Sequence, residues 1–536
     1  MASRARLTLE SLPVEVIELI LQWLVPLQPE IGDTHPVAYD QLAEGEFWFD
    51  FTRCRRGLAS LCLASRRLSV MAQPLLYRVM AILDEDQMVL FLRTLAGNPV
   101  IGILTRHVSC HLTLTSAESM PETRRALTTY LHTFEYASQP QALIQSVRTY
   151  MSLVNPDDHA PFDDIPELLL SYILLFLPKL ETILLQVPVV DYPEDFPLIQ
   201  RLSLAKDMFF SPDDPESLPF AKVHTLFLQG DPEMIEHFDE NDCECSVPDF
   251  YGVQVPRYGV LSKAFPNLTT LEVYADDGIW TDSNFQYSLY ASGQTEFTPY
   301  MSAIRHLYLH DSCACPRNMH HILRNAPNLE TLYMTPRPNA YFEVEEGEED
   351  LEVAQPDALD VALAAYGKNL RHLDISWNTA QGYEGLIGPD GQLTSLCEMP
   401  KLEKLYVQLA ALYGISPTAL ETPMAELLPP NLVDLTLEDY WWHNCDDYEE
   451  MEDWDQYEKI RHYKTQHIYR KNAVRLLKDF ARDAKERVPR LKKVLLLPRI
   501  PWTWMMEDSD VTIEYHFEEV IALFRDEGIE FLVELM

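Results

Sequence analysis

A short apolar motif, L-x-x-L-x-L, constrains this chain more than any other feature, because it recurs along most of the sequence. Seven of its ten occurrences have a proline two positions before the leading residue, which makes a chance pattern unlikely. Apolar residues at alternate positions are typical of strands with one buried face, so each motif predicts one short strand. The ten motifs are Leu180-Ile183-Leu185, Ile199-Leu202-Leu204, Val223-Leu226-Leu228, Leu268-Leu271-Val273, Ile304-Leu307-Leu309, Leu329-Leu332-Met334, Leu370-Leu373-Ile375, Leu402-Leu405-Val407, Leu432-Leu435-Leu437 and Leu491-Val494-Leu496.

The spacing between motifs predicts how the strands are connected. Leading residues lie 19 to 59 positions apart. The shortest spacings match leucine-rich repeats, and the longer ones imply insertions. Each repeat would be a parallel strand on the concave face followed by a helix on the convex side. We expect helices at 320–325, 357–366 and 471–487, and a last strand at 528–533. The predicted fold class is α/β, with an irregular repeat solenoid over residues 81–536 and a parallel sheet on its concave face.

The first 80 residues lack this motif and show helical periodicity instead. Apolar residues recur at the 3.6-residue spacing of one helix face, after a proline in the first turn. Two further amphipathic stretches cover 58–68 and 71–77. In the first helix the proline is Pro13 and the apolar residues are Val16, Ile17, Ile20 and Leu24, with Ser11 as the expected N-cap. In the stretch 71–77 we expect a break near Pro74. We therefore expect a separate three-helix unit at 1–80.

This helical unit resembles an F-box. The family usually has a short turn between its first two helices, where this chain has an insertion at 25–50. Together with the repeats, the resemblance is to F-box proteins with leucine-rich repeats. The resemblance lies in Leu9, Leu12-Pro13, Glu15, Val16-Ile17, Ile20, Leu24, residues 58–68, and residues 72–78, which are similar to a segment that often follows the F-box in fungal members.

The resemblance implies the function of a substrate receptor. Such a chain docks on the adaptor subunit of an SCF-type, cullin-RING ubiquitin ligase and binds a target protein through its repeats. It is not itself an enzyme, and no cofactor or metal is implied. Two alternatives stay open: a scaffold or assembly factor that acts without ubiquitin transfer, and a plain three-helix bundle with no adaptor. By resemblance, the adaptor-binding residues are Leu12, Pro13, Val16, Ile17, Ile20, Leu24 and Leu61.

Strand alternation predicts which side chains face the target. In each motif the residue between the last two apolar positions points away from the core, onto the concave face. Several of these residues are aromatic. Aromatic side chains suit any strand, and they also dominate binding hot spots, so both interpretations remain open. The candidate target-binding residues are Phe227, Glu272, Tyr308, Tyr333, Asp374 and Tyr406.

The formal net charge of -41 is concentrated in three acidic insertions, 231–250, 341–360 and 438–458. They contain 8, 9 and 10 acidic residues and no lysine or arginine. Each begins shortly after a predicted strand, so we expect all three at one edge of the solenoid. There they would attract a basic segment of the target, or simply keep long insertions solvated. The same charge argues against nucleic acid and anionic membranes as partners.

Other chemistry has little support in the sequence. The chain has no phosphate-binding G-x-x-x-x-G-K-S/T loop, no G-x-S-x-G and no H-E-x-x-H, so nothing favours a hydrolase or transferase. The pairs Cys243/Cys245 and Cys313/Cys315 lack the usual zinc-ligand spacing, and the adjacent Cys110 and His111 do not make a catalytic dyad. Nine cysteines without a signal peptide or a membrane-length apolar run predict a soluble protein of the cytoplasm and/or nucleus.

Overall fold

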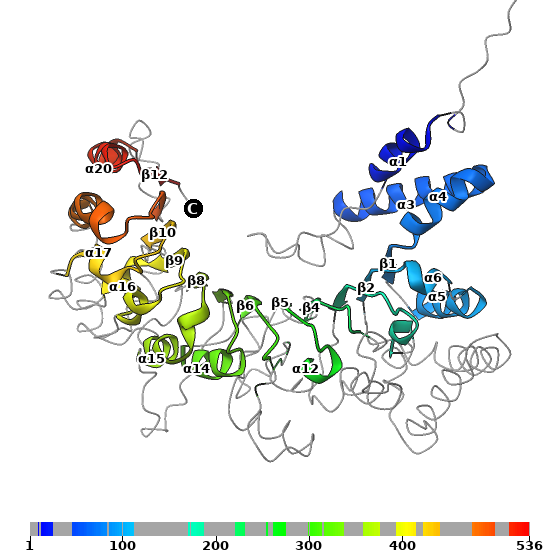
Figure 1. Ribbon diagram of the computed structural model, residues 1–536, viewed down its shortest axis with the longest axis horizontal. Helices are drawn as coiled ribbons and strands as arrows, with labels where there is room; N and C mark the ends of the chain where they lie inside the picture. Colours follow the sequence, from blue (N-terminus) through cyan, green and yellow to red (C-terminus); the bar gives the residue numbers. More distant parts are fainter. Residues whose placement is uncertain are drawn as a thin grey trace, which may run out of the picture. The chain divides into compact units, whose positions relative to one another are not determined.

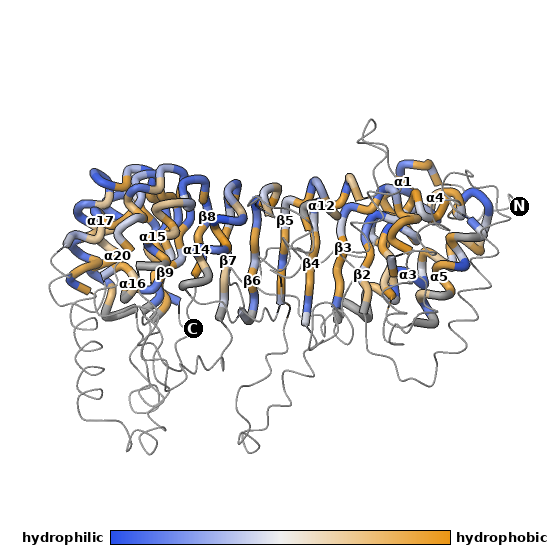
Figure 2. Tube along the Cα trace, turned by 90° about the horizontal axis from the view of Figure 1, so that it is seen from below, coloured by the Kyte–Doolittle hydropathy of each residue, from blue (hydrophilic) through white to orange (hydrophobic). Residues whose placement is uncertain are grey.

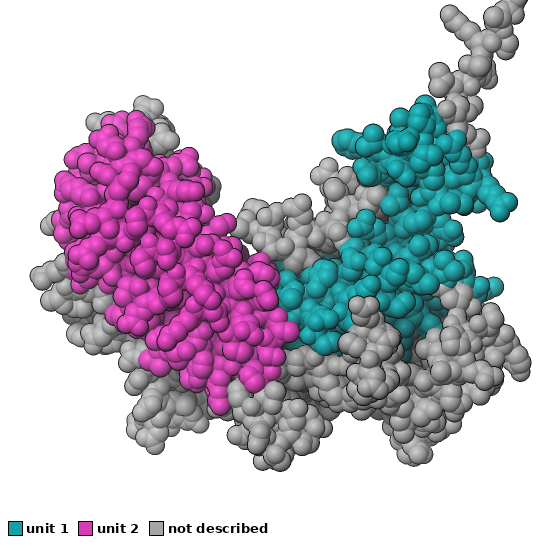
Figure 3. Space-filling model, viewed as in Figure 1, with its two compact units in different colours: residues 1–275, 287–294 teal, residues 276–286, 295–536 magenta. Residues whose placement is uncertain are grey.

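A computed structural model describes residues 9, 12–24, 46–82, 85–98, 100–111, 170–171, 173–186, 220–230, 253, 255, 261–274, 299, 301–312, 316–336, 357–375, 393–413, 422–439, 474–498 and 514–534. None of the helices in these ranges has both the length and the apolar character needed to cross a membrane. The chain divides into two compact units, residues 1–275 with 287–294, and residues 276–286 with 295–536 (Figure 3). This division falls within the repeats, and the expected boundary near residue 80 stays a prediction.

The first unit begins with three helices, α1 (Val14–Gln22), α3 (Glu46–Ala64) and α4 (Arg66–Leu76). Pro13 directly precedes α1, and its carbonyl accepts the first two helical hydrogen bonds. The amphipathic stretch expected at 58–68 is not one helix. It is divided at Ser65, whose Oγ accepts the amide of Leu68 at 3.2 Å and caps α4. The break expected near Pro74 is also wrong, because Pro74 lies inside α4.

An apolar core joins these three helices. Ile17 and Leu21 of α1 pack with Leu58 of α3 and with Leu68 and Ala72 of α4, and all five are at most 3% exposed. Burying a side chain of this size contributes about 1.5–3 kcal/mol, so these contacts rather than helix propensity stabilise the unit. Residues 46–50, the end of the predicted insertion, belong to α3, and residues 25–45 lie outside the described part of the chain.

Five parallel strands follow in chain order: β1 (Val79–Ile82), β2 (His107–His111), β3 (Thr182–Gln186), β4 (Thr225–Gln229) and β5 (Thr270–Tyr274). The helices α5 (Glu85–Gly97), α6 (Val100–Leu104) and α12 (Leu261–Ala264) lie between them in sequence. Strands β3, β4 and β5 confirm three of the predicted motifs, while the motif at 199–204 lies outside the described residues. Strands β1 and β2 were not predicted.

The second unit continues the pattern with β6 (His306–Ser312), β7 (Thr331–Pro336), β8 (His372–Ile375), β9 (Lys404–Gln408), β10 (Asp434–Asp439), β11 (Lys493–Pro498) and β12 (Glu530–Val533), again parallel and in chain order. Helices α14 (Pro316–Asn325), α15 (Asp357–Tyr366), α16 (Leu409–Tyr413), α17 (Met424–Leu427), 474–487 and α20 (Glu514–Asp526) lie on one side of these strands (Figure 1). The remaining predicted strands and the three predicted helices are confirmed. The side turned away from these helices is the predicted concave face, and it keeps that name below.

Alternation along each strand fixes the core of the repeats. In β7, Leu332 and Met334 are fully buried toward the helices, whereas Tyr333 between them is half-buried on the concave face. Figure 2 shows the apolar residues gathered along the strands and hydrophilic ones at the turns. The motif therefore builds the sheet by placing two apolar side chains per strand against the helices.

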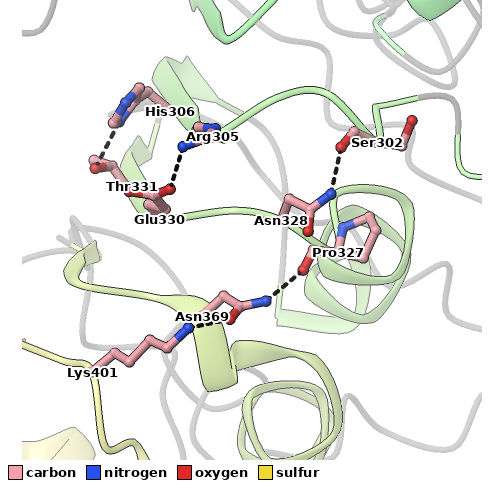
Figure 4. A network of polar contacts seen from close by, with 9 residues as sticks. All are labelled: Ser302, Arg305, His306, Pro327, Asn328, Glu330, Thr331, Asn369 and Lys401. Carbon is pink, nitrogen blue, oxygen red and sulfur yellow. Dashed lines mark hydrogen bonds and ion pairs between the residues drawn. The ribbon is translucent and has the colours of Figure 1, made fainter.

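Polar side chains join successive repeats just before several of the strands, and Figure 4 shows three such repeats. The amide of Asn328 donates to the carbonyl of Ser302 at 2.9 Å, and that of Asn369 donates to the carbonyl of Pro327 at 3.1 Å. Arg305 and Glu330 form an ion pair across the same edge at 3.1 Å. Asparagines directly before the leading leucine satisfy the carbonyl of the preceding repeat, a role that the sequence analysis missed.

Candidate interaction surfaces

Helix α1 has two apolar faces, and only one of them packs in the core. Ile17 and Leu21 face α3 and α4 and are at most 2% exposed. A second face carries four apolar residues that follow the spacing i, i+3, i+4 and i+7, so they lie along one side of the helix. These residues, which we call the outer face of α1, are Val16, Leu19, Ile20 and Trp23, with exposed fractions of 38%, 58%, 37% and 87%.

The residues predicted to bind an adaptor fall into three environments. Val16, Ile20 and Pro13 are exposed. Ile17 is fully buried among the three helices, so it supports the unit and contributes no accessible surface. Three more are partly buried against the same core: Leu12, Leu24 and Leu61. The sequence analysis missed Leu19 and Trp23, although their helical spacing with Val16 and Ile20 was readable in the sequence.

On the concave face of the second unit, four predicted residues come into one row. The strand register aligns Tyr308 with Tyr333, Tyr333 with Asp374, and Asp374 with Tyr406 across β6, β7, β8 and β9. All four are half-buried. The rings of Tyr308 and Tyr333 lie 6.2 Å apart, and the ring of His310 lies 5.0 Å from that of Tyr333. These four residues, the central row, form a continuous polar and aromatic surface.

Two carboxylates lie close together at this row. Burial and the negative charge of Glu438 raise the pKa of Asp374 to about 7. Glu438, on β10, is 1% exposed, and its Oε2 accepts a hydrogen bond from Gln408 at 3.2 Å. Strand alternation places Gln408 on the same face as Tyr406, two positions closer to the C-terminal end of β9. Burial and the neighbouring negative charge therefore favour the protonated form of the Asp374 carboxyl.

The corresponding residues of the first unit are buried. Phe227 on β4 and Glu272 on β5 occupy aligned positions in the register, and each is 4% exposed. His107 on β2 is also buried, and burial together with the charge of Arg78 lowers its pKa to about 4. Phe227 and Glu272, both predicted to bind a target, are therefore neighbours across two strands but offer no accessible surface in this structure.

The three acidic insertions lie mostly outside the described residues. In the second unit, β7 ends at Pro336 and β10 at Asp439, and parallel strands end at the same sheet edge. The strands that precede 341–360 and 438–458 therefore end at one edge, and the position of the insertions themselves stays a prediction. Among their described residues, Asp360 is structural: its carboxylate accepts Thr394 Oγ1 at 2.6 Å and the amide of Ser395 at 2.7 Å.

The described residues hold little that points to catalysis. Cys110 is fully buried in β2, and burial raises the pKa of its thiol, which disfavours the reactive thiolate. The two C-x-C pairs lie outside the described ranges. Within those ranges no three histidine, cysteine or acidic side chains come together as metal ligands.

Comparison with models of known protein families finds no match, and comparison with curated proteins finds none either.

Proposed function

We propose that this chain is the substrate-recognition subunit of an SCF-type, cullin-RING ubiquitin ligase. Its N-terminal helices dock on the adaptor, and its repeats bind the target protein. The chain itself performs no chemistry in this proposal. Its contribution is proximity, because it raises the effective concentration of target lysines near a ubiquitin-charged enzyme.

The observation that carries the proposal is the outer face of α1. A helix of a globular protein usually has one apolar face, which packs in the core, yet α1 has a second one on which Leu19 and Trp23 are 58% and 87% exposed. Leu63 at the end of α3 is 88% exposed as well. Exposed apolar surface of this kind marks a protein interface, and it lies on the segment whose sequence resembles an F-box.

The central row supports the second half of the proposal. It places three tyrosines and a carboxylate on the concave face, where repeat proteins usually bind their partners. Tyrosine is enriched at binding hot spots because it combines a large apolar ring with a polar hydroxyl.

A capture experiment with purified adaptor and cullin tests the proposal. The full-length parent is expected to retain both proteins, and the double variant Leu19→Glu/Trp23→Glu is expected to retain neither, because two carboxylates would face the apolar adaptor surface. The matched control is Val361→Glu, since Val361 on α15 is 54% exposed and belongs to the second unit.

Two results would change the interpretation. A parent that captures no adaptor contradicts the receptor proposal. A parent that captures adaptor without cullin favours a scaffold or assembly factor that works without ubiquitin transfer.

A further inference from the structure

The last strand of the second unit has an open edge. β12 pairs with β11 on one side, and β11 is its only strand neighbour among the described residues (Figure 1). The amide of Glu530 donates to the carbonyl of Lys492 on the β11 side at 2.8 Å. Backbone groups of successive residues point to opposite edges of a strand, so those of Phe531 and Val533 point away from β11. They are the groups with which a further strand would pair.

Helix α20 holds β12 in its extended conformation. Gly528, with a φ of +73°, makes the turn between them, and the amide of Ile529 donates to the carbonyl of Phe524 at 2.9 Å. The ring of Phe531 stacks on that of Phe524 at 4.9 Å, and both side chains are at most 6% exposed. Because β12 is already fixed in shape, it loses little conformational freedom when another strand pairs with it.

The side chains of β12 are more accessible than those of β1, the first strand of the first unit. Three of the four residues of β1 are at most 8% exposed. In β12, by contrast, Leu532 and Val533 are half-buried and Glu530 is exposed, as is Glu534 directly after the strand. A terminal strand with accessible apolar residues is a template for pairing with another strand.

The charges along one row of the concave face indicate which residue suits the next strand. The register aligns one charged residue on each of β9, β10, β11 and β12: Lys404, Asp434, Lys493 and Glu530. Their signs alternate from strand to strand. Opposite charges at facing positions of neighbouring strands are favourable and like charges are unfavourable, so the position next to Glu530 favours lysine or arginine.

Two further positions complete the pattern. Leu532 faces Leu495 of β11, so the position next to Leu532 favours an apolar residue. Glu534 lies on the same face as Glu530, and among the described residues neither glutamate forms an ion pair. A strand with the pattern basic-x-apolar-x-basic places a cation opposite each glutamate, whether it runs parallel or antiparallel to β12.

A second copy of this chain is a less suitable partner for the same edge. Pairing two β12 strands in register, in either direction, places glutamate opposite glutamate, which is unfavourable. Charged residues on edge strands are a common protection against such self-association. The two carboxylates that disfavour a second copy favour a basic strand.

We propose that the open edge of β12 binds a strand of a partner protein with the sequence pattern basic-x-apolar-x-basic, which extends the sheet. Hydrogen bonds to the backbone of Phe531 and Val533 provide affinity, and the side chains on the concave face select the sequence. The inference uses no residue of the outer face of α1 or of the central row, so it does not rest on the proposed function.

Fluorescence anisotropy of the full-length chain with a fluorescein-labelled peptide, Gly-Lys-Thr-Leu-Thr-Lys-Gly, tests the proposal. One control peptide has glutamate in place of both lysines, and another has N-methyl groups on the amides of its threonines and leucine. The variant Glu530→Lys/Glu534→Lys reverses the charge of the edge. Its matched control is Glu518→Lys/Asp526→Lys, which changes two exposed acids of α20. Val533→Pro removes an amide that points to the open edge and leaves the bonds to β11 in place.

The parent is expected to bind the lysine peptide about tenfold more tightly than the glutamate peptide or the N-methylated peptide. Charge reversal at the edge should reverse the preference between lysine and glutamate, whereas the matched control should keep it. Val533→Pro should weaken binding by about tenfold. Thermal unfolding of each variant verifies its fold, and the N-methylated peptide tests the same hydrogen bonds without altering the chain.

Several results would overturn the proposal. These are no binding of the lysine peptide by the parent, equal binding of the N-methylated peptide, and a preference for lysine that survives charge reversal. Sedimentation of the chain without peptide tests the second copy: self-association that Val533→Pro abolishes would assign the edge to another copy of this chain instead. Adaptor capture has no bearing on any of these results.

Discussion

The two units contain the same strand motif in the same parallel register, yet the residues at its centre have opposite environments. Phe227 in the first unit is 4% exposed, whereas the equivalent Tyr333 in the second is half-buried. The motif therefore determines which way a side chain points but not whether solvent reaches it. Sequence position assigns a residue to the concave face, and only the packed structure separates the core residues of that face from those able to contact a partner.

The largest expected effect comes from truncating these two equivalent residues. Phe227→Ala should destabilise the chain by about 3–5 kcal/mol, because it empties a buried position. Tyr333→Ala should cost only about 1 kcal/mol, because part of its ring already contacts water. Urea denaturation followed by tryptophan fluorescence measures both. Equal losses would remove the distinction between the two units.

A pH-dependent stabilisation is expected next in size, at Asp374. A carboxyl whose pKa rises on folding stabilises the fold at low pH, and this contribution disappears as pH increases through about 7. Asp374→Asn should therefore raise stability at pH 8 by roughly 1–3 kcal/mol and raise it clearly less at pH 5, because the contribution is lost progressively between the ordinary pKa of 3.8 and about 7. Melting temperatures of parent and variant at the two pH values provide the measurement. A variant that is less stable than the parent at pH 8 would contradict the buried-acid account.

The asparagines before the strands should behave alike in the two units. Asn267 donates to the carbonyl of Ala221 at 2.7 Å, and Asn328 donates to that of Ser302 at 2.9 Å. Replacing either by alanine should cost about 1 kcal/mol, the usual net value of one hydrogen bond. The same denaturation curves give the answer, and a large difference between the two would show that the repeats are not joined equivalently.

The smallest effects are expected at the ion pairs between repeats. Arg106 pairs with Glu181 at 3.0 Å and also donates to the carbonyl of Lys179 at 3.2 Å, and its side chain is 28% exposed. Arg305, at 58% exposed, pairs with Glu330 alone among the described residues. Arg106→Ala should cost about 1 kcal/mol and Arg305→Ala about 0–0.5 kcal/mol. Unfolding midpoints at low and high salt would test whether Arg305 is the weaker site.

Sequence reasoning predicted most of the described strands because leucine spacing is a direct consequence of a strand packed on one side. It missed β1 and β2, where other residues fill the same positions. Thr105, Val108 and Cys110 have the spacing of the motif before and within β2, and all three are fully buried. The motif was not recognised there because threonine and cysteine replace two of its leucines. Leu19 and Trp23 of the outer face of α1 were missed as well, because they are not part of the family pattern that pointed to Val16 and Ile20.

The accessible part of the candidate site could not be predicted in the same way. Glu272 and Asp374 occupy equivalent motif positions, yet Glu272 is 4% exposed and Asp374 is half-buried. The effect of the Glu438 charge on Asp374 reaches across two strand neighbours and depends on the register of three separate repeats. Such contacts between distant segments are properties of the folded sheet, not of any local stretch of sequence.

The most direct test of the central claim is a calorimetric titration of the full-length chain with the purified SCF adaptor. The account predicts saturable binding by the parent and by Val361→Glu, with a loss of at least about tenfold for Leu19→Glu/Trp23→Glu, equivalent to about 1.4 kcal/mol or more. Parent binding that survives unchanged in the double variant, or no heat of binding in the parent, would contradict the assignment of α1 as the adaptor-docking helix.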